Sequence, residues 1–257
     1  MRTQKKRPSM KFDFVTIASH QLRTPLSAMK WFLEMLIAGN AGKLTGRQRE
    51  FLSEVYKSNE RMIRLVNDLL IVSKITQKSF RLSPHPFVFE QMVASVIKEV
   101  KPIIQSAQIT VVCKFDASPR TCVNADEDKI RQVIRTLFDN AVRYMVDGGL
   151  IIVRVDHRNR HVAFEIQDTG VGIPRNERAK IFQQFFRGSN IVRMRTEGTG
   201  LGLFIAHAII TASGGSISFT SQEGKGSAFR VSLPVSQKGL MASCEKPLKK
   251  KQRRVHK

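Results

Sequence analysis

Two long runs with an apolar residue at every third or fourth position constrain the N-terminal third of this chain more than any other feature. The first run extends from Val15 to Leu36, and after the segment "AGNAGKLTG" the second extends from Leu52 to Ser73. This heptad spacing predicts two helices, and the short connection between them predicts a helical hairpin. Because a lone hairpin cannot cover its apolar faces, we expect a homodimer with a four-helix bundle. The expected seams are Val15, Ala18, Leu22, Pro25, Met29, Phe32 and Leu36, and Leu52, Val55, Asn59, Met62, Val66, Leu69 and Ser73.

His20 stands on the face of the first predicted helix that lies furthest from this seam. With the seam at heptad positions a and d, His20 takes position f, so we expect its imidazole to be hydrated and largely neutral near pH 7. Pro25 has no N–H group and removes the usual partner of the Gln21 carbonyl, so the helix should bend there. A solvated surface histidine fits this helix equally well, so a reactive His20 requires chemistry from elsewhere in the chain.

The pattern changes near "TQKSFRLSPHPF", where Pro84 and Pro86 indicate a linker. Beyond it, helical patterns alternate with β-branched and aromatic runs such as "LIIVRV" and "SAFRVSL". This mixture predicts an α/β domain whose sheet is covered by helices on one face. The expected helices are 90–107, 127–146 and 200–213, and the expected strands are 109–115, 150–156, 161–168, 215–220 and 227–233.

The two ends of the chain carry more than half of its net charge of +22. Residues 1–11 carry +5 and residues 236–257 carry +7, which together make 12 of the 22. Such ends can attract nucleic acid or an anionic membrane, although a solvated, disordered tail has the same composition. We therefore expect a basic segment 1–11, a hairpin 12–78, a linker 79–86, an α/β domain 87–235 and a basic disordered tail 236–257.

The sequence shows no signal for a membrane or a secreted location. No apolar run approaches the roughly 20 residues of a membrane-spanning helix, and the basic N-terminal segment does not lead into a signal-peptide core. Cys113, Cys122 and Cys244 have no metal-ligand spacing, and their odd number argues against a complete disulfide framework. We expect a cytoplasmic protein.

The segment "EIQDTGVGIP" ends a strand in which Val162, Phe164 and Ile166 alternate toward the core. By the same alternation Asp168 points inward, and a buried carboxylate needs a donor such as the amino group of a ligand. Gly170 and Gly172 would allow a close approach of the backbone to that ligand. A turn whose carboxylate caps its own backbone is the alternative.

Two further segments suggest a nucleotide. In "EGTGLGLFIAHAI", glycines precede a helix whose free N–H groups can bind phosphate, although Gly-rich helix starts also serve packing. In "DKIRQVIRTLFDNAVRYM", Thr136, Asn140 and Tyr144 share one helix face. The amide oxygen of Asn140 suits Mg²⁺, which keeps several waters and shares phosphate oxygens, whereas a plain polar helix edge is the alternative. All three segments in one domain favour a Mg-nucleotide site.

Five segments in a fixed order resemble the catalytic core of bacterial sensor histidine kinases, over a region from Phe12 to Pro234. "SHQLRTPL" is similar to the phosphoacceptor box, "FDNAVRY" to the Asn box, "DTGVGIP" and "GTGLGL" to the two glycine boxes, and "IFQQFFRG" to the Phe box. The resemblance implies a HisKA-type hairpin that forms a dimeric four-helix bundle. An α/β sandwich of the GHKL (Bergerat) type that binds ATP would follow it.

By this resemblance His20 would receive the γ-phosphoryl group of Mg-ATP and pass it to an aspartate of a response-regulator receiver domain. Asn140 would hold Mg²⁺, Asp168 would accept from the adenine amino group, and Tyr144 would lie against the base. The segment 175–197 would be the ATP lid. Gln21 and Thr24 would assist His20, and the other implied ATP-binding residues are Arg143, Gly170, Gly172, Ile173, Phe185, Arg187, Gly198, Thr199, Gly200, Leu201, Gly202 and Leu203.

Three positions depart from the usual family pattern. Gln21 stands where Glu or Asp commonly takes the imidazole proton, and because an amide is not an effective base we expect slower phosphotransfer. Thr24 keeps the position that orients water when the regulator is dephosphorylated. Thr136 replaces a second Asn, which bears on Mg²⁺ affinity, and Arg143 replaces a common Lys while keeping its charge.

An active histidine autokinase is therefore the leading hypothesis. The alternatives are a weakly active kinase that serves mainly as a phosphatase or scaffold, and a basic adaptor for nucleic acid or a membrane surface that keeps the fold without the chemistry. The sequence contains no recognisable sensor domain. We therefore expect either a separate sensor protein as a partner, or a sequence that is a fragment or an orphan core.

Overall fold

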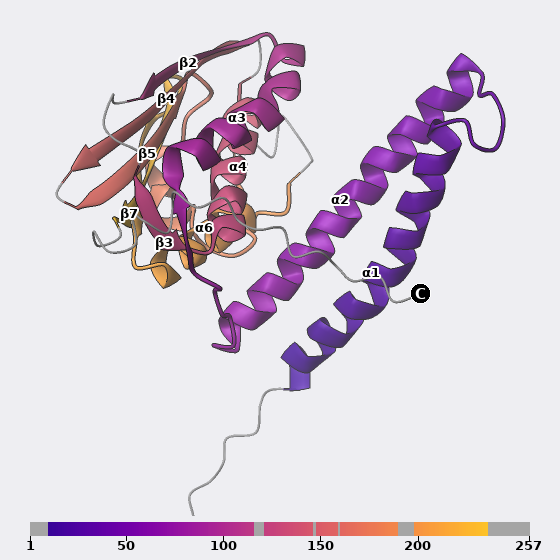
Figure 1. Ribbon diagram of the computed structural model, residues 1–257, viewed down its shortest axis with the longest axis horizontal. Helices are drawn as coiled ribbons and strands as arrows, with labels where there is room; N and C mark the ends of the chain where they lie inside the picture. The colour runs from indigo at the N-terminus through magenta and orange to yellow at the C-terminus, as the bar shows by residue number, and fades with distance from the viewer. Residues whose placement is uncertain (1–9, 116–120, 146–147, 159, 190–197, 236–257) are drawn as a thin grey trace, which may run out of the picture. The chain divides into compact units, whose positions relative to one another are not determined.

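The computed structural model describes residues 10–115, 121–145, 148–158, 160–189 and 198–235. The chain divides into two compact units, Met1–Arg81 and Leu82–Lys257 (Figure 1). Of the expected basic ends, 1–9 of segment 1–11 and all of 236–257 lie outside the described residues, whereas residues 10 and 11 begin the first helix.

The first unit is a helical hairpin, as the heptad spacing predicts. Helix α1 spans Met10–Ile37 and helix α2 spans Gly46–Thr76. Thr45 begins α2 with a reciprocal capping box: the Gln48 N–H donates to Thr45 Oγ1 at 3.2 Å, and the Thr45 N–H donates to Gln48 Oε1 at 2.9 Å. Pro25 lies inside α1, whose helical assignment runs through it. The expected bend at Pro25 stays a prediction.

A narrow set of residues holds the two helices of the hairpin together. Leu26 and Leu33 of α1 and Val66 of α2 are buried. Asn59 is buried as well and donates from Nδ2 to the Leu26 carbonyl at 3.0 Å, so a polar side chain inside the interface has a partner. Polar contacts join the two helices as well. Arg23 donates to Asn67 Oδ1 at 2.9 Å, and Lys30 forms an ion pair with Glu60 at 2.8 Å.

Much of the predicted seam of α1 is exposed in the single hairpin. Leu22, Met29 and Phe32 are 52%, 45% and 58% exposed, whereas their neighbours Leu26 and Leu33 pack inside. The apolar face of α1 is therefore wider than the strip that α2 covers, and the heptad spacing follows the middle of that face. Val55 and Met62 of α2 are likewise exposed. We call the exposed residues Leu22, Met29, Phe32, Val55 and Met62 the open seam of the hairpin.

The second unit is an α/β domain built on a five-stranded sheet in the order β2-β4-β5-β7-β6. Strand β2 pairs with β4 in parallel, and the other neighbours are antiparallel. The sheet strands are β2 (Ile109–Phe115), β4 (Gly149–Arg158), β5 (His161–Asp168), β6 (Ser216–Gln222) and β7 (Gly226–Pro234).

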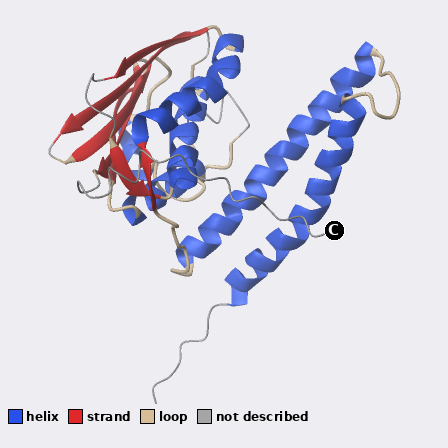
Figure 2. Ribbon diagram, viewed as in Figure 1, coloured by secondary structure: helices blue, strands red, loops and turns tan. Residues whose placement is uncertain are grey.

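Three helices cover one face of this sheet, as Figure 2 shows. They are α3 (Phe89–Ser106), α4 (Glu127–Arg143) and α6 (Gly202–Ala212). Each places a buried apolar stripe on the sheet, and Phe138 of α4 meets Phe164 of β5 with ring centroids 6.1 Å apart. The sheet with helices on one face confirms the predicted fold class.

The structure differs from the predicted elements mainly before α4. A two-stranded antiparallel ribbon pairs β1 (His85–Val88) with β3 (Cys122–Ala125), and the sequence patterns predict neither strand. Residues 85 and 86, expected in the linker, open β1, where Pro86 pairs with Asn124. Proline is tolerated there because the ribbon is too narrow to have a central strand. Helix α4 ends three residues earlier than predicted, at Arg143. Within the described residues, no helix is long and apolar enough to span a bilayer.

Candidate functional site

A cavity that opens to solvent lies in the second unit among α4, the end of β5, the segment after β5, the start of α6 and β7, and its empty space together with its open mouth is about 610 Å³. Seven of the predicted ATP-binding residues line its wall, and they come from four separate stretches of sequence. The fold therefore gathers in one place most of the segments that the sequence analysis singled out. The predicted residues in the wall are Asn140, Tyr144, Asp168, Gly172, Ile173, Arg187 and Leu203.

Asp168 is the buried carboxylate of this cavity. Alternation along β5 buries Val162, Phe164 and Ile166, and Asp168 continues on the same face at 7% exposure. Its Oδ1 atom accepts the Gly170 N–H at 2.9 Å and the Ser227 N–H at 3.2 Å. Burial raises the pKa of this carboxyl, and the two backbone donors oppose that rise. Among the described residues Oδ2 has no hydrogen-bond donor, so it can accept from a ligand amino group.

Gly172 and Gly200 allow two close contacts that shape the cavity. Gly172 has a left-handed backbone with φ of 65°, and a Cβ there would collide with the Gln222 carbonyl. Gly200 has φ of 68°, and a Cβ would lie 2.6 Å from the Phe185 carbonyl carbon. Any other residue at these positions would combine an unfavourable φ with a backbone clash.

Helix α4 supplies the polar edge of the cavity. Burial raises the pKa of the Tyr144 hydroxyl, and the positive charges of Arg143 and Arg187 act against that rise. Thr136 donates its hydroxyl to the Gln132 carbonyl at 2.9 Å and is engaged within its own helix. The Asn140 side chain lines the cavity and has no hydrogen bond to another described residue.

The second glycine box forms the start of α6. Thr199 Oγ1 accepts the Leu201 N–H at 3.2 Å, and Leu201 is fully buried beneath the turn. Gly202 opens the helix, and its first N–H groups have no intrahelical partner. A Cβ at Gly198 would lie 3.5 Å from Arg143 Nη1 and 3.7 Å from Arg187 Nε. Two cations and a helix N-terminus thus meet at this end of the cavity, which suits phosphate.

The structure separates the residues of the Phe box. Phe182 packs its ring against His207 at 5.2 Å and Phe219 at 5.9 Å between centroids. Phe185, predicted to bind ATP, is instead 59% exposed and has a left-handed φ of 61°, whereas Phe186 lines the cavity. Of the expected lid, 175–180 forms the 3₁₀ helix η1 (Arg175–Lys180), and 190–197 lies outside the described residues.

The sequence analysis did not name six residues of the wall: Glu177, Ile181, Phe186 and Gly188, which lie within the expected lid 175–197, and Ser227 and Phe229, which lie in β7. Phe229 could have been found, because it alternates with Val231 and Leu233 on the inner face of β7. Ser227 donates its backbone N–H to Asp168. Because every residue except proline has this group, the side-chain pattern of the sequence could not predict the contact.

Magnesium fits the donors present at the cavity. The described residues contain no group of three or more His, Cys, Asp or Glu side chains that would hold a metal by itself. Asn140 offers one neutral oxygen, which suits an ion that takes its other ligands from water and phosphate.

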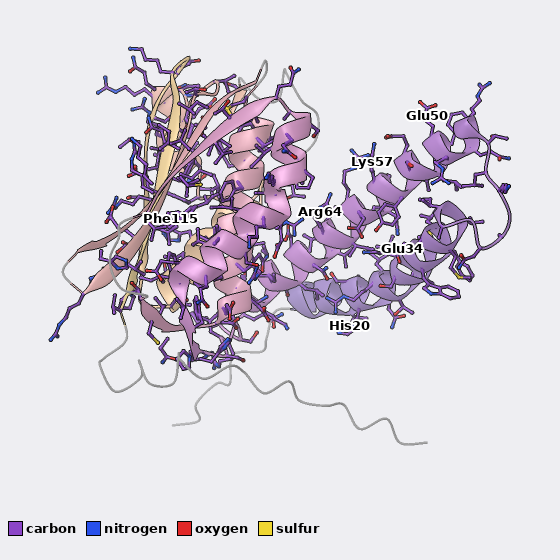
Figure 3. The ribbon with its side chains drawn as sticks, turned by 45° about the horizontal axis from the view of Figure 1, so that its top comes forward. His20, Glu34, Glu50, Lys57, Arg64 and Phe115 are labelled. Carbon is purple, nitrogen blue, oxygen red and sulfur yellow. The ribbon has the colours of Figure 1, made fainter. Side chains whose placement is uncertain are left out.

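The predicted phosphoacceptor residues lie in the first unit. His20, Gln21 and Thr24 are all exposed on α1, and Figure 3 marks His20 there. Ser19, next to His20, is buried at 3% exposure. The exposure of His20 agrees with its predicted place at heptad position f.

Comparison with known families matches both units. Residues 10–78 match the family model of the His Kinase A (phospho-acceptor) domain. Residues 125–237 match the model described as histidine kinase-, DNA gyrase B- and HSP90-like ATPase.

Curated relatives and solved structures point the same way. The chain is 32% identical to the circadian input-output histidine kinase CikA of Synechococcus elongatus over 87% of its length, and 32% identical to the sensor histidine kinase WalK of Bacillus subtilis over 91%. It spans only 30% and 38% of those proteins. The structure of ShkA in complex with AMPPNP matches with a TM-score of 0.70 at 27% identity, covering 88% of this chain and 46% of ShkA. The histidine kinase AdeS of Acinetobacter baumannii matches with a TM-score of 0.58 at 27% identity, covering 85% of this chain and 98% of AdeS.

Proposed function

The chain belongs to the sensor histidine kinases and carries their two-domain catalytic core, and from this premise we propose that it transfers the γ-phosphoryl group of ATP to its own His20. The observation that carries the proposal is the cavity around Asp168, where one carboxylate oxygen is held by two backbone N–H groups and the other has no donor among the described residues. An acceptor held in this way suits the amino group of adenine.

The residues of the cavity divide between the two ends of the nucleotide. Asp168 would receive the adenine amino group, and the apolar side chains of Ile173 and Phe229 would enclose the base. Arg143, Arg187 and the N-terminus of α6 would neutralise the phosphates. Asn140 would hold Mg²⁺, which neutralises phosphate charge when bound.

The transfer itself needs little more than alignment and charge neutralisation. A neutral ring nitrogen of His20 attacks the γ-phosphorus, and the bond from that phosphorus to the oxygen shared with the β-phosphate breaks, so ADP leaves. The second ring nitrogen then releases its proton. Gln21 can orient the ring but cannot accept that proton, so the proton passes to water, and we expect a slow transfer.

The partners follow from the same proposal. The open seam of the hairpin supports a homodimer, because exposed apolar side chains at heptad spacing are the surface that a second hairpin covers. The onward acceptor is an aspartate of a response-regulator receiver domain, and a separate sensor protein would supply the signal. We place the chain in the cytoplasm, where its substrate ATP is available.

A second candidate is a weak kinase that acts mainly as a phosphatase of its regulator. The exposed pair of Gln21 and Thr24 supports it, because the first lacks a base and the second has a hydroxyl that can orient water. A basic adaptor, acting through the chain ends, would instead show binding that weakens steeply with added salt.

The test is an acid-stability assay on the purified chain with γ-labelled Mg-ATP. We expect a protein-bound phosphate that is lost in acid and kept in base, and we expect His20→Gln to abolish it. His161→Gln, which changes another exposed histidine, serves as the matched control and should keep the label. A label that resists acid, or that survives in His20→Gln, contradicts the autokinase. ATP binding without label, together with release of phosphate from a phosphorylated regulator, favours the phosphatase.

A further inference from the structure

Glu177 places a carboxylate in the wall of the nucleotide cavity, although an anionic group there does not suit a triphosphate. It belongs to η1 and is half-buried. Both of its oxygens accept the backbone N–H of Ser189, Oε1 at 3.1 Å and Oε2 at 3.2 Å. The carboxylate therefore has a defined partner, and this contact joins two segments that are 12 residues apart.

This hydrogen bond fixes the backbone immediately after the Phe box. Arg187 and Gly188, the two residues before Ser189, both line the cavity. The Arg187 guanidinium lies near Gly198, beside that of Arg143. Arg187 therefore stands at the end of the cavity where cations and the α6 N-terminus meet, and the position of its backbone determines whether its guanidinium reaches that end.

The first half of the Phe box is anchored in another way. The Phe182 ring packs at a tilt against His207 of α6 and edge-on against Phe219 of β6. Between Phe182 and Arg187 the chain turns through the left-handed residue Phe185, so the aromatic anchor does not by itself fix the backbone beyond that turn. The bond from the Ser189 N–H to Glu177 ties the second half back to η1.

We propose that Glu177 is a positioning residue for the phosphate end of the cavity, because it holds Arg187 in place through Gly188 and Ser189. The inference rests on the proposed function and adds to it a residue that acts through the Ser189 N–H, which both of its carboxylate oxygens accept. Its loss should weaken ligands that carry phosphate and leave a ligand without phosphate unaffected. A purely structural role would weaken both classes together.

Two variants remove the same bond from opposite ends. Glu177→Ala deletes the acceptor, and Ser189→Pro deletes the N–H donor. Asn176→Ala changes an exposed neighbour in η1 and is the matched control. Glu177→Gln keeps a neutral acceptor in the same shape and should restore most of the effect.

The experiment is calorimetric titration of the full chain with Mg-AMPPNP and, separately, with adenosine. We expect the dissociation constant for AMPPNP to rise about 10-fold in Glu177→Ala and in Ser189→Pro, the scale of one hydrogen bond to a charged group. The double variant should equal either single variant, because all three lack the same bond. Adenosine should bind equally to all of them, and Asn176→Ala should behave as wild type.

Three results overturn the inference while leaving the proposed function intact: unchanged AMPPNP affinity in both single variants, an equal loss for AMPPNP and adenosine, or additive losses in the double variant. A wild-type chain that binds neither ligand overturns the proposed function and this inference with it.

Discussion

The hairpin and the ATP-binding domain use apolar residues in opposite ways. In the hairpin, large side chains such as Leu22, Phe32 and Val55 are more than half exposed, although they recur at a regular spacing. In the ATP-binding domain, Phe138 and Phe164 are fully buried between α4 and β5. Three helices over a five-stranded sheet enclose a core of their own, whereas two helices leave one face uncovered.

This difference indicates that the ATP-binding domain buries its apolar residues within one chain, whereas the hairpin leaves an apolar face for a second chain. The ATP-binding domain needs only its own chain to form its core and the cavity beside it. We expect the hairpin to need a second hairpin, so its stability should depend on protein concentration. The proposed phosphoacceptor His20 is thus on the part that we expect to be dimeric, and the proposed nucleotide site is on the self-contained part.

The largest expected effect comes from placing a charge in the open seam. Burial of a Phe side chain contributes about 1.5–3 kcal/mol, and a symmetric dimer contains Phe32 twice. Phe32→Glu should therefore weaken dimerisation by roughly 10²- to 10⁴-fold, measured by sedimentation equilibrium. Phe115→Glu, which changes an exposed Phe of the ATP-binding domain, is the control and should leave the dimer intact. A dimer unaffected by Phe32→Glu would break the comparison.

The next largest effect is a loss of stability of the ATP-binding domain caused by a substitution at Gly172. Gly172→Ala introduces a left-handed alanine and a clash with the Gln222 carbonyl, so we expect a loss of about 3 kcal/mol in the free energy of unfolding of this domain. Urea unfolding measures it. Gly224→Ala has a similar φ of 74° with open space around the new methyl group, so its loss should be about 1 kcal/mol. Equal losses would show that the clash is relieved, and altered dimerisation would show that the two parts are not independent.

Asp168→Asn separates binding from stability. The amide lacks the free carboxylate oxygen, so nucleotide affinity should fall about 10- to 100-fold, measured by calorimetry. Burial raises the folded-state pKa of Asp168 above the ordinary value of 3.8. The contribution of this carboxyl to stability is therefore fully present below that value and is lost as pH rises through the folded-state pKa. Asp168→Asn should not lose stability as pH rises through this range, and it should be at least as stable as wild type at neutral pH.

That pattern would be contradicted by two results. One is an Asp168→Asn domain that loses stability and affinity together, which would make the carboxylate a structural group. The other is unchanged nucleotide affinity, which would remove Asp168 from the base site and leave the cavity without its adenine acceptor.

The sequence predicted most elements, because their patterns are local. Alternation along β5 placed Asp168 on the buried face, and the 3.6-residue period placed Asn140 and Tyr144 on one side of α4. Heptad spacing likewise found both helices of the hairpin.

The parts that sequence could not predict depend on contacts between distant segments. The β1–β3 ribbon joins two short strands, one of which contains a proline, and neither has a pattern of its own. The choice of Leu26 over Leu22 for the α1–α2 interface depends on how the helices are rotated against each other. Phe186 rather than Phe185 lines the cavity, and Phe185 has a left-handed φ. The sequence could not predict this turn, because phenylalanine rarely adopts such a φ.

The smallest expected effect compares one helix cap in each part. Thr45 caps α2 of the hairpin and Asp126 caps α4 of the ATP-binding domain, where its Oδ1 accepts the Lys129 N–H at 3.2 Å. Each change to alanine should cost about 1 kcal/mol. The two losses should nevertheless depend differently on protein concentration, because we expect only the hairpin to unfold together with dissociation.

In thermal unfolding of the full chain, Asp126→Ala should lower the midpoint of the ATP-binding domain by about 2–4 °C at every protein concentration. Thr45→Ala should lower the hairpin midpoint at each protein concentration. We expect the midpoints of the variant and of wild type both to rise with protein concentration. Asp126→Ser, which keeps a capping oxygen, should recover most of the loss. A midpoint of the hairpin that does not move with concentration would mean that its open seam is stable in water without a second copy, and the distinction between the two parts would then fail.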